Sequence, residues 1–264
     1  MEKSFQYNNT HIHYTIQGSG QPIVLLHGFG EDSTVWQEQA FFLQAYATVI
    51  TPDLPGSGHS ALLQQDNVGM SDYAVCIHAL LQHENISRCI LLGHSMGGYI
   101  TLAYAEMYPA HLQGFGFINS TAFADTEEKK ASRQQGIQMM EEYGAFAFLK
   151  NAIPTLFAKA YKAQHSDKIA ALVEKGKQFT TAALVQYYTA MMDRPDRTHV
   201  LRAAQVPVLF TLGTADIAAP LQDLLQQVHL PNSSHIHILE DIGHMSMMEA
   251  ADKVNNHILE FLNL

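Results

Sequence analysis

Hydrophobic residues along this chain cluster in short continuous runs that alternate with longer segments of helical period. Four-residue runs at 23–26, 89–92 and 115–118 are typical of strands that are covered on both faces of a sheet. Directly after the second of these runs, residues 96–107 have the pattern of a helix that ends near a proline. Because strands and helices alternate repeatedly, we predict an α/β fold with a doubly wound, mostly parallel sheet.

The alternation of strands and helices breaks at residue 121. From there to residue 197 the apolar positions follow a helical period, and no segment predicts a strand. The strand pattern returns at 206–210 and 235–239, and a helix closes the chain. We therefore expect a core formed by residues 1–120 and 198–264, interrupted by a helical insertion of residues 121–197.

Composition limits the classes of protein that this chain can represent. Of its 264 residues, 47% are hydrophobic and 15% are charged, which allows a large buried core. The formal net charge of −10 argues against a nucleic-acid partner, because binding to phosphates requires clustered lysine and arginine. Cys76 and Cys89 lie in apolar runs, and we expect buried free thiols. The first ten residues have no apolar segment of the kind found in secretory signals, and no apolar run approaches the about 18 residues of a membrane helix. We therefore expect a cytoplasmic protein without a membrane partner.

The strongest chemical signal is the sequence Gly93-His94-Ser95-Met96-Gly97, which lies between an apolar run and a predicted helix. A sharp turn from strand to helix strains the backbone at its centre, and small residues two positions before and after it avoid a clash. Such a turn lifts the serine hydroxyl above the sheet, at a helix N-terminus that favours developing negative charge. We therefore predict that Ser95 is a nucleophile, against the alternative that it only caps the helix.

A serine nucleophile requires a base and an acid that orients the base, in the chain order serine, acid, histidine. His244 follows the last predicted strand and a glycine, and we predict that it is the base. Asp216 follows the preceding predicted strand and is the predicted acid. Asp125 is a competing candidate for the acid, whereas Asp241 is expected to be a loop residue because it stands only three positions before His244.

Acyl transfer by a serine also requires backbone donors that stabilise the oxyanion of the intermediate. The N–H of Met96, directly after the predicted nucleophile, is one candidate. Phe29 is the other, because it lies in the glycine-rich segment His27-Gly28-Phe29-Gly30 that follows the first buried run. We expect the ring of His27 to bond to nearby backbone and to have a structural role.

Together these motifs resemble the serine-nucleophile branch of the α/β-hydrolase superfamily, in particular small esterases and peroxidase-like members. The resemblance covers nearly the whole chain and rests on residues 27–30, 53–60, 93–98, 213–216 and 243–244. It implies an eight-stranded sheet in which the helical insertion follows the sixth strand and forms a lid over the active site.

The resemblance implies acyl transfer through an acyl-enzyme, which requires neither a metal nor an organic cofactor. Some of the phenylalanine, tyrosine and methionine residues of the insertion are expected to line an apolar cleft, so we expect the substrate to be a small, largely apolar carboxylic ester. Hydrolysis of a carbon–carbon bond, a lyase step or perhydrolysis by the same triad are alternatives, and so is a non-enzymatic receptor for a small ligand. We make no prediction about the oligomeric state. The residues that we expect to contact the substrate are His94, Phe123, Phe146, Tyr188 and Met245.

Overall fold

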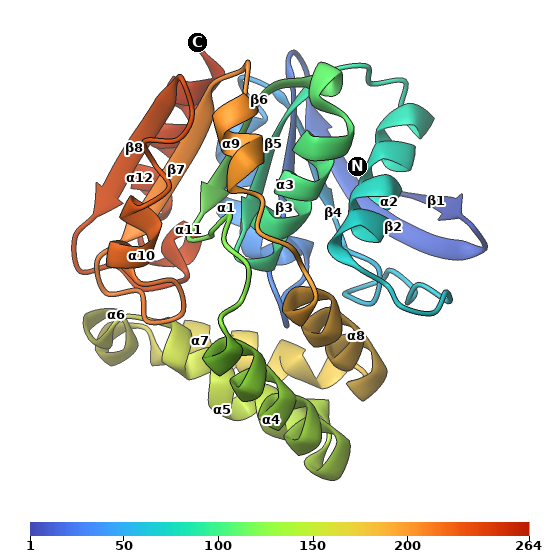
Figure 1. Cartoon of the computed structure of the whole chain (residues 1–264), viewed down its shortest axis with the longest axis vertical. Coiled ribbons are helices and arrows are strands. Elements are labelled where there is room, and N and C mark those ends of the chain that lie inside the picture. The colour runs from blue at the N-terminus through green and yellow to red at the C-terminus, as the bar shows by residue number, and fades with distance from the viewer. Residues whose placement is uncertain (264) are drawn as a thin grey trace.

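The computed structural model describes residues 1–263, which form an eight-stranded sheet with helices on both faces (Figure 1). The strand order is β1-β2-β4-β3-β5-β6-β7-β8, and every pair from β4 onward in that order is parallel. The fold therefore confirms the predicted doubly wound, mostly parallel sheet. The strands are β1 (Glu2–Tyr7), β2 (Thr10–Gly18), β3 (Pro22–Leu26), β4 (Thr48–Pro52), β5 (Cys89–His94), β6 (Leu112–Ile118), β7 (Val208–Gly213) and β8 (Ser234–Leu239).

The strand pattern follows from burial and from local turn chemistry. All residues of β5 and β7 are buried, which explains why each strand begins with a run of apolar residues instead of alternating. By contrast, β1 and β2 form an antiparallel hairpin at one edge of the sheet. Asn8 and Asn9 in its turn have φ values of 46° and 64°, a left-handed conformation that asparagine tolerates well.

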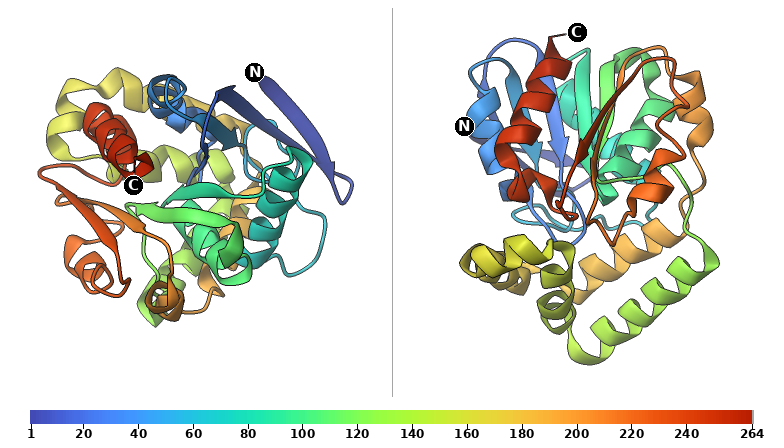
Figure 2. Two further views of the ribbon diagram at one scale, coloured as in Figure 1. Left: turned by 90° about the horizontal axis from the view of Figure 1, so that it is seen from above. Right: turned by 90° about the vertical axis from the view of Figure 1, so that its left-hand side faces the viewer.

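Helices cover both faces of the sheet, as the view from above shows (Figure 2). Helices α1 and α12 lie on one face, and helices α2, α3 and α9 lie on the other. Cys76 in α2 and Cys89 in β5 are buried free thiols, as the sequence predicted. The helices of the core are α1 (Gln37–Leu43), α2 (Met70–His83), α3 (Met96–Met107), α9 (Thr198–Ala203), α10 (Leu221–Leu225), α11 (Ser246–Glu249) and α12 (Ala251–Leu262), with short 3₁₀ helices η1 (Ser33–Trp36) and η2 (Pro109–His111).

After β6 the chain leaves the sheet and forms a separate helical layer, drawn in green to light orange in the lower part of Figure 1. Thr126 and Thr180 begin α4 and α8, which pack against each other, and each side chain accepts an N–H from the first turn of its helix. No helix of residues 1–263 is long and apolar enough to cross a membrane. The layer consists of α4 (Glu127–Tyr143), α5 (Ala145–Ala152), η3 (Ile153–Leu156), α6 (Lys159–Gln164), α7 (Ser166–Lys175), η4 (Gly176–Gln178) and α8 (Thr181–Met192).

Candidate active site

Ser95 occupies a sharp turn between β5 and α3. Its φ and ψ angles of 50° and −115° are unusual for a residue with a side chain, so the surroundings must hold this conformation. A Cβ atom on Gly93 would lie 2.2 Å from the backbone of Gly97, and one on Gly97 would lie 2.4 Å from the carbonyl oxygen of Leu26. The close approach of these backbones therefore requires glycine on both sides of Ser95.

Asp216 and His244 form a buried hydrogen-bonded pair at the carboxyl ends of β7 and β8. The Nδ1 atom of His244 lies 2.8 Å from Oδ2 of Asp216, and both residues are only 4% exposed. The side chain of Asn119, which directly follows β6, donates to the same oxygen at 2.9 Å. The N–H groups of Ala218 and Ala219 donate to Oδ1, each at 2.9 Å. The aspartate is thus held in one orientation, with one oxygen directed at the histidine.

The electrostatics of this pair favour an ionised aspartate. Burial acts to raise the pKa of Asp216, but the charge and hydrogen bond of His244 and the donors described above lower that pKa overall. Burial likewise acts to lower the pKa of His244, and the neighbouring Asp216 carboxylate outweighs it and raises that pKa. Such a carboxylate stabilises the imidazolium that forms when a histidine accepts a proton.

The backbone of His244 is also anchored to the turn that carries Ser95. Its carbonyl oxygen lies 3.0 Å from Nε2 of His94, the residue directly before Ser95. The rings of His94 and His244 are 4.8 Å apart between centroids. Three segments that are distant in sequence, after β5, β7 and β8, are thereby brought together at one edge of the sheet.

The loop after β3 offers a free backbone donor beside this edge. Within residues 1–263, neither the N–H of Phe29 nor that of Met96 donates a hydrogen bond. His27 braces the loop: its Nε2 atom accepts the N–H of Leu54 at 2.9 Å, so Nδ1 carries the proton and donates to the carbonyl of Gly28 at 2.9 Å. Two unpaired N–H groups thus remain available for a ligand oxygen.

His94 is buried behind the turn and has no free ring nitrogen. Its Nδ1 atom lies 3.1 Å from Oε2 of Glu31, and its Nε2 atom faces the carbonyl of His244. Burial acts to raise the pKa of Glu31, but His94 and the N–H of Gly28 lower it overall, so the carboxylate is ionised and can only accept. Both ring nitrogens of His94 thus have a hydrogen-bond partner, and the ring ties two loops together.

An aromatic group from the helical layer packs on the loop after β3. The ring of Tyr188 in α8 stacks on that of Phe29 at 4.2 Å between centroids. Phe148 in α5 meets both rings edge-on, at 6.1 Å from Phe29 and 5.7 Å from Tyr188. The guanidinium of Arg133 lies over the ring of Tyr188, 5.1 Å from its centroid. Sequence reasoning singled out Tyr188 but missed Phe148.

The other residues expected to contact substrate lie in different surroundings. Phe146 lies on α5, and the ammonium group of Lys177 is 5.4 Å from the centroid of its ring. Met245 is fully buried directly after His244. Phe123 is half-buried in the segment after β6, and its carbonyl accepts a hydrogen bond from Arg194 at 3.0 Å.

The two alternative acids, Asp125 and Asp241, lie away from the pair formed by His244 and Asp216. Asp125 forms ion pairs with Arg133 at 2.6 Å and with Arg194 at 2.9 Å. Asp241 is exposed in the loop before His244. Within residues 1–263, no group of three or more histidine, cysteine, aspartate or glutamate side chains is arranged to hold a metal ion.

Comparison with known proteins agrees with this architecture. The family model for the alpha/beta hydrolase fold matches residues 21–137. The chain is 31% identical, over 92% of its length, to the dihydrolipoyllysine-residue acetyltransferase component of the acetoin cleaving system of Pseudomonas putida, of which it spans 64%. It is 28% identical to a 2-hydroxy-6-oxononadienedioate/2-hydroxy-6-oxononatrienedioate hydrolase of Burkholderia vietnamiensis, with 95% of this chain and 90% of that protein covered.

A solved structure is similar over the whole chain. The esterase of Thermogutta terrifontis superposes with a TM-score of 0.93 and 26% identity, covering 100% of this chain and 98% of the esterase. The fold, the family model and the relatives agree, and the chain belongs to the α/β-hydrolase superfamily. It is an enzyme of that superfamily, whose members among its relatives include esterases, lipases and carbon–carbon bond hydrolases.

Proposed function

We propose that this enzyme hydrolyses a small, largely apolar carboxylic ester, with Ser95 as nucleophile, His244 as base and Asp216 as the acid that orients it. The observation that carries the proposal is the buried hydrogen bond of 2.8 Å between His244 and Asp216, at the sheet edge where Ser95 occupies its strained turn. In the neutral ring of His244 the single proton lies on Nδ1, which donates to the carboxylate, so Nε2 carries no proton and can act as a base.

The reaction has two acyl-transfer steps. Ser95 Oγ attacks the ester carbonyl while His244 Nε2 takes the hydroxyl proton, and the N–H groups of Phe29 and Met96 donate to the oxyanion that forms. The carbon–oxygen bond to the alcohol breaks, and the alcohol leaves with the proton from His244. A water molecule then loses a proton to His244, attacks the acyl-enzyme and releases the carboxylic acid together with the restored Ser95 hydroxyl.

We propose that residues 121–197 form a lid over this site. The stacked rings of Phe29 and Tyr188, which join a loop of the core to α8, support this role because they place an aromatic surface next to the proposed oxyanion donors. Such a surface favours an acyl or aryl group without charge. The chain spans only 64% of the length of the acetyltransferase component, so we do not propose the acetyltransferase activity of that whole protein for this chain.

Labelling with a fluorophosphonate tests the proposed nucleophile. We expect rapid stoichiometric labelling of the wild-type protein and none of Ser95→Ala. A panel of p-nitrophenyl esters, from acetate to octanoate, then measures kcat/KM against acyl length, with Ser95→Ala as the control. A folded wild-type protein that is not labelled would refute the serine mechanism and favour a receptor.

Carbon–carbon bond hydrolysis by the same residues is the second candidate. It is favoured by the similarity to the Burkholderia hydrolase, whose named substrate carries a 6-oxo group and no ester. Comparison of kcat/KM for a dienoic 6-oxo acid with that for the preferred ester separates the two functions. A higher value for the oxo acid would replace the ester proposal while leaving Ser95, His244 and Asp216 in their roles.

A further inference from the structure

Glu249, at the end of α11, binds the loop of His244 on both sides of that residue. Its Oε2 atom accepts the N–H of Gly243 at 3.1 Å, and its Oε1 atom accepts the N–H of Met245 at 3.2 Å. The carboxylate therefore spans the backbone of His244 without touching its ring. This arrangement fixes the direction in which the loop presents the imidazole.

The same carboxylate also binds the helical layer. Oε2 of Glu249 accepts the N–H of Ala158, directly before α6, at 3.0 Å. The N–H of His244 in turn donates to the carbonyl of Leu156 at 2.7 Å. A Cβ atom on Gly243 would lie within 2.8 Å of Ala158, Glu249 and Leu156, so the two segments are in direct contact. The segment 156–158 and the loop of His244 thus form one hydrogen-bonded unit.

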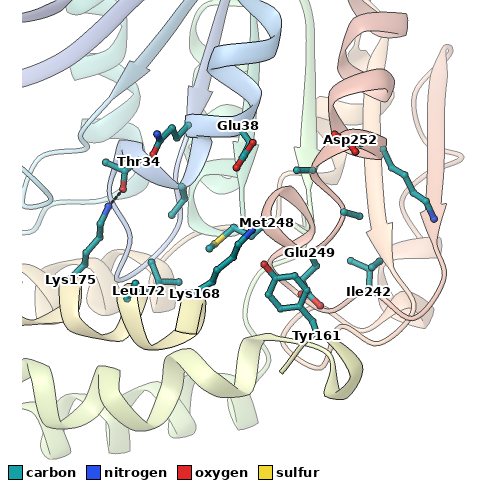
Figure 3. Close-up of a pocket in the computed structure, with 16 residues that line it drawn as sticks. Thr34, Glu38, Tyr161, Lys168, Leu172, Lys175, Ile242, Met248, Glu249 and Asp252 are labelled. Atoms are coloured by element: carbon teal, nitrogen blue, oxygen red, sulfur yellow. Dashed lines mark hydrogen bonds between the residues drawn. The ribbon is translucent and has the colours of Figure 1, made fainter. Parts of the chain in front are cut away.

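Glu249 is partly exposed and lines a cleft beside the loop of His244. This cleft has a volume of about 660 Å³ and lies between η1, α7 and the start of α12 (Figure 3). Neither Ser95 nor His244 lines it. Burial acts to raise the pKa of Glu249, and the backbone donors only partly offset this effect. Charged and titratable groups that face this unit from other elements include Asp216 after β7, His94 at the end of β5, Glu31 before η1 and Tyr161 in α6. Glu38 in α1 and the lysines Lys168 and Lys175 in α7 line the same cleft as Glu249.

We propose that Glu249 is a positioning residue, which joins segment 156–158 of the helical layer to the loop of His244 so that the lid and the base move as one unit. This inference rests on the proposed function, because it assigns His244 as the base. Glu249 acts in two ways. Its hydrogen bonds hold the loop in place, and its negative charge adds to that of Asp216 in favouring the protonated form of His244.

The rate at which a fluorophosphonate labels Ser95, measured against pH, tests this proposal without knowledge of the substrate. Glu249→Gln cannot accept all three N–H groups, and we expect the maximal labelling rate to fall by about 10- to 100-fold, the effect of a small misplacement of a reacting group. Because the negative charge is also lost, the pKa of His244 falls, and we expect the acid limb of the profile to move to lower pH. A purely structural defect would lower the rate without moving the limb.

Glu38→Gln is the matched control, since Glu38 is exposed on the rim of the same cleft. We expect neither its rate nor its acid limb to change. Ala158→Pro is the second variant: the φ of −60° at Ala158 suits proline, and the substitution removes the N–H that Glu249 accepts while leaving the charge. We expect a lower labelling rate with an unmoved acid limb.

The outcomes separate this inference from the proposed function. If the wild-type protein is labelled and Glu249→Gln matches it in rate and in acid limb, the positioning role is wrong and the nucleophile stands. If Glu249→Gln does not fold, an unchanged rate for Ala158→Pro would overturn the link between the lid and the loop. A folded wild-type protein that resists labelling would overturn both proposals together.

Discussion

The substitution Asp216→Asn tests the proposed triad through a single atom. In the wild-type protein Oδ1 accepts the N–H groups of Ala218 and Ala219, while Oδ2 lies 2.8 Å from Nδ1 of His244 and 2.9 Å from the amide nitrogen of Asn119. An asparagine that keeps its oxygen on the two backbone donors places its NH₂ group where Oδ2 stood. That NH₂ group then faces a donor on Asn119 and the ring of His244.

The consequence is a change of tautomer at the base. Nδ1 of His244 must accept a hydrogen bond from the new amide, so the ring proton moves to Nε2, which can then no longer take the proton of Ser95. The same exchange of acid for amide in the triad of a serine protease lowers kcat by about 10⁴-fold. We expect a loss of about 10⁴-fold in kcat, equivalent to about 5.4 kcal/mol of transition-state stabilisation at 1.36 kcal/mol per factor of ten.

The assay is steady-state hydrolysis of the preferred p-nitrophenyl ester, with circular dichroism to verify folding. Asp241→Asn is the matched control, because Asp241 is exposed in the loop before His244 and its φ of 58° suits asparagine. We expect that control to retain wild-type kcat. A folded Asp216→Asn protein with kcat within tenfold of the wild type would refute the assignment of Asp216.

Three further predictions concern the turn, the buried ion pair and the aromatic group. Gly97→Ala places a methyl group 2.4 Å from a backbone oxygen of β3, so we expect a loss of folding or of several kcal/mol of stability in urea denaturation (about 1–3 kcal/mol or more for overpacking). The pKa of Glu31 is lowered in the folded state, so its contribution to stability is present above the unfolded pKa and is lost as pH falls through the folded pKa. We therefore expect the melting temperature of Glu31→Gln to fall less steeply toward acid pH than that of the wild type, and an equally steep fall would contradict an ionised Glu31 paired with His94. Tyr188→Ala removes the ring stacked on Phe29, an interaction of about 0.5–1.5 kcal/mol beyond burial, so we expect kcat/KM to fall by about two- to tenfold, with recovery in Tyr188→Phe.

Local sterics and hydrophobic pattern determined most of the architecture before any tertiary contact was known. The apolar runs at 89–92 and 115–118 fall in β5 and β6. A strand covered on both faces has no side exposed to solvent, so its residues are apolar in a continuous run. The glycines around Ser95 predicted the sharp turn for an equally local reason: the contact that excludes a side chain at Gly93 comes from the start of the adjoining helix. Strand ends also placed Asp216 and His244 at a common edge of the sheet.

Tertiary packing decided which side chains of an element face the site. Phe146 and Phe148 both lie on α5, but residues two apart point to nearly opposite sides of a helix, and only the packing of α5 shows that Phe148 meets Phe29. His94 has the sequence position of a residue that could face the substrate. Its contact with Glu31, which lies 63 positions away in the chain, turns it instead toward the loop of His244.

The sequence by itself thus determined the order of strands and helices, the strained turn at Ser95 and the chain order of the three residues that we propose for the chemistry. Only the tertiary structure linked Glu249 to Ala158 across 91 positions and gave Asp216, with Asn119 beside it, a defined hydrogen-bonding set. The physical reason is the range of the forces involved. Periodicity and backbone sterics act within a few residues, whereas hydrogen bonds between distant loops exist only after the sheet has brought its strand ends together.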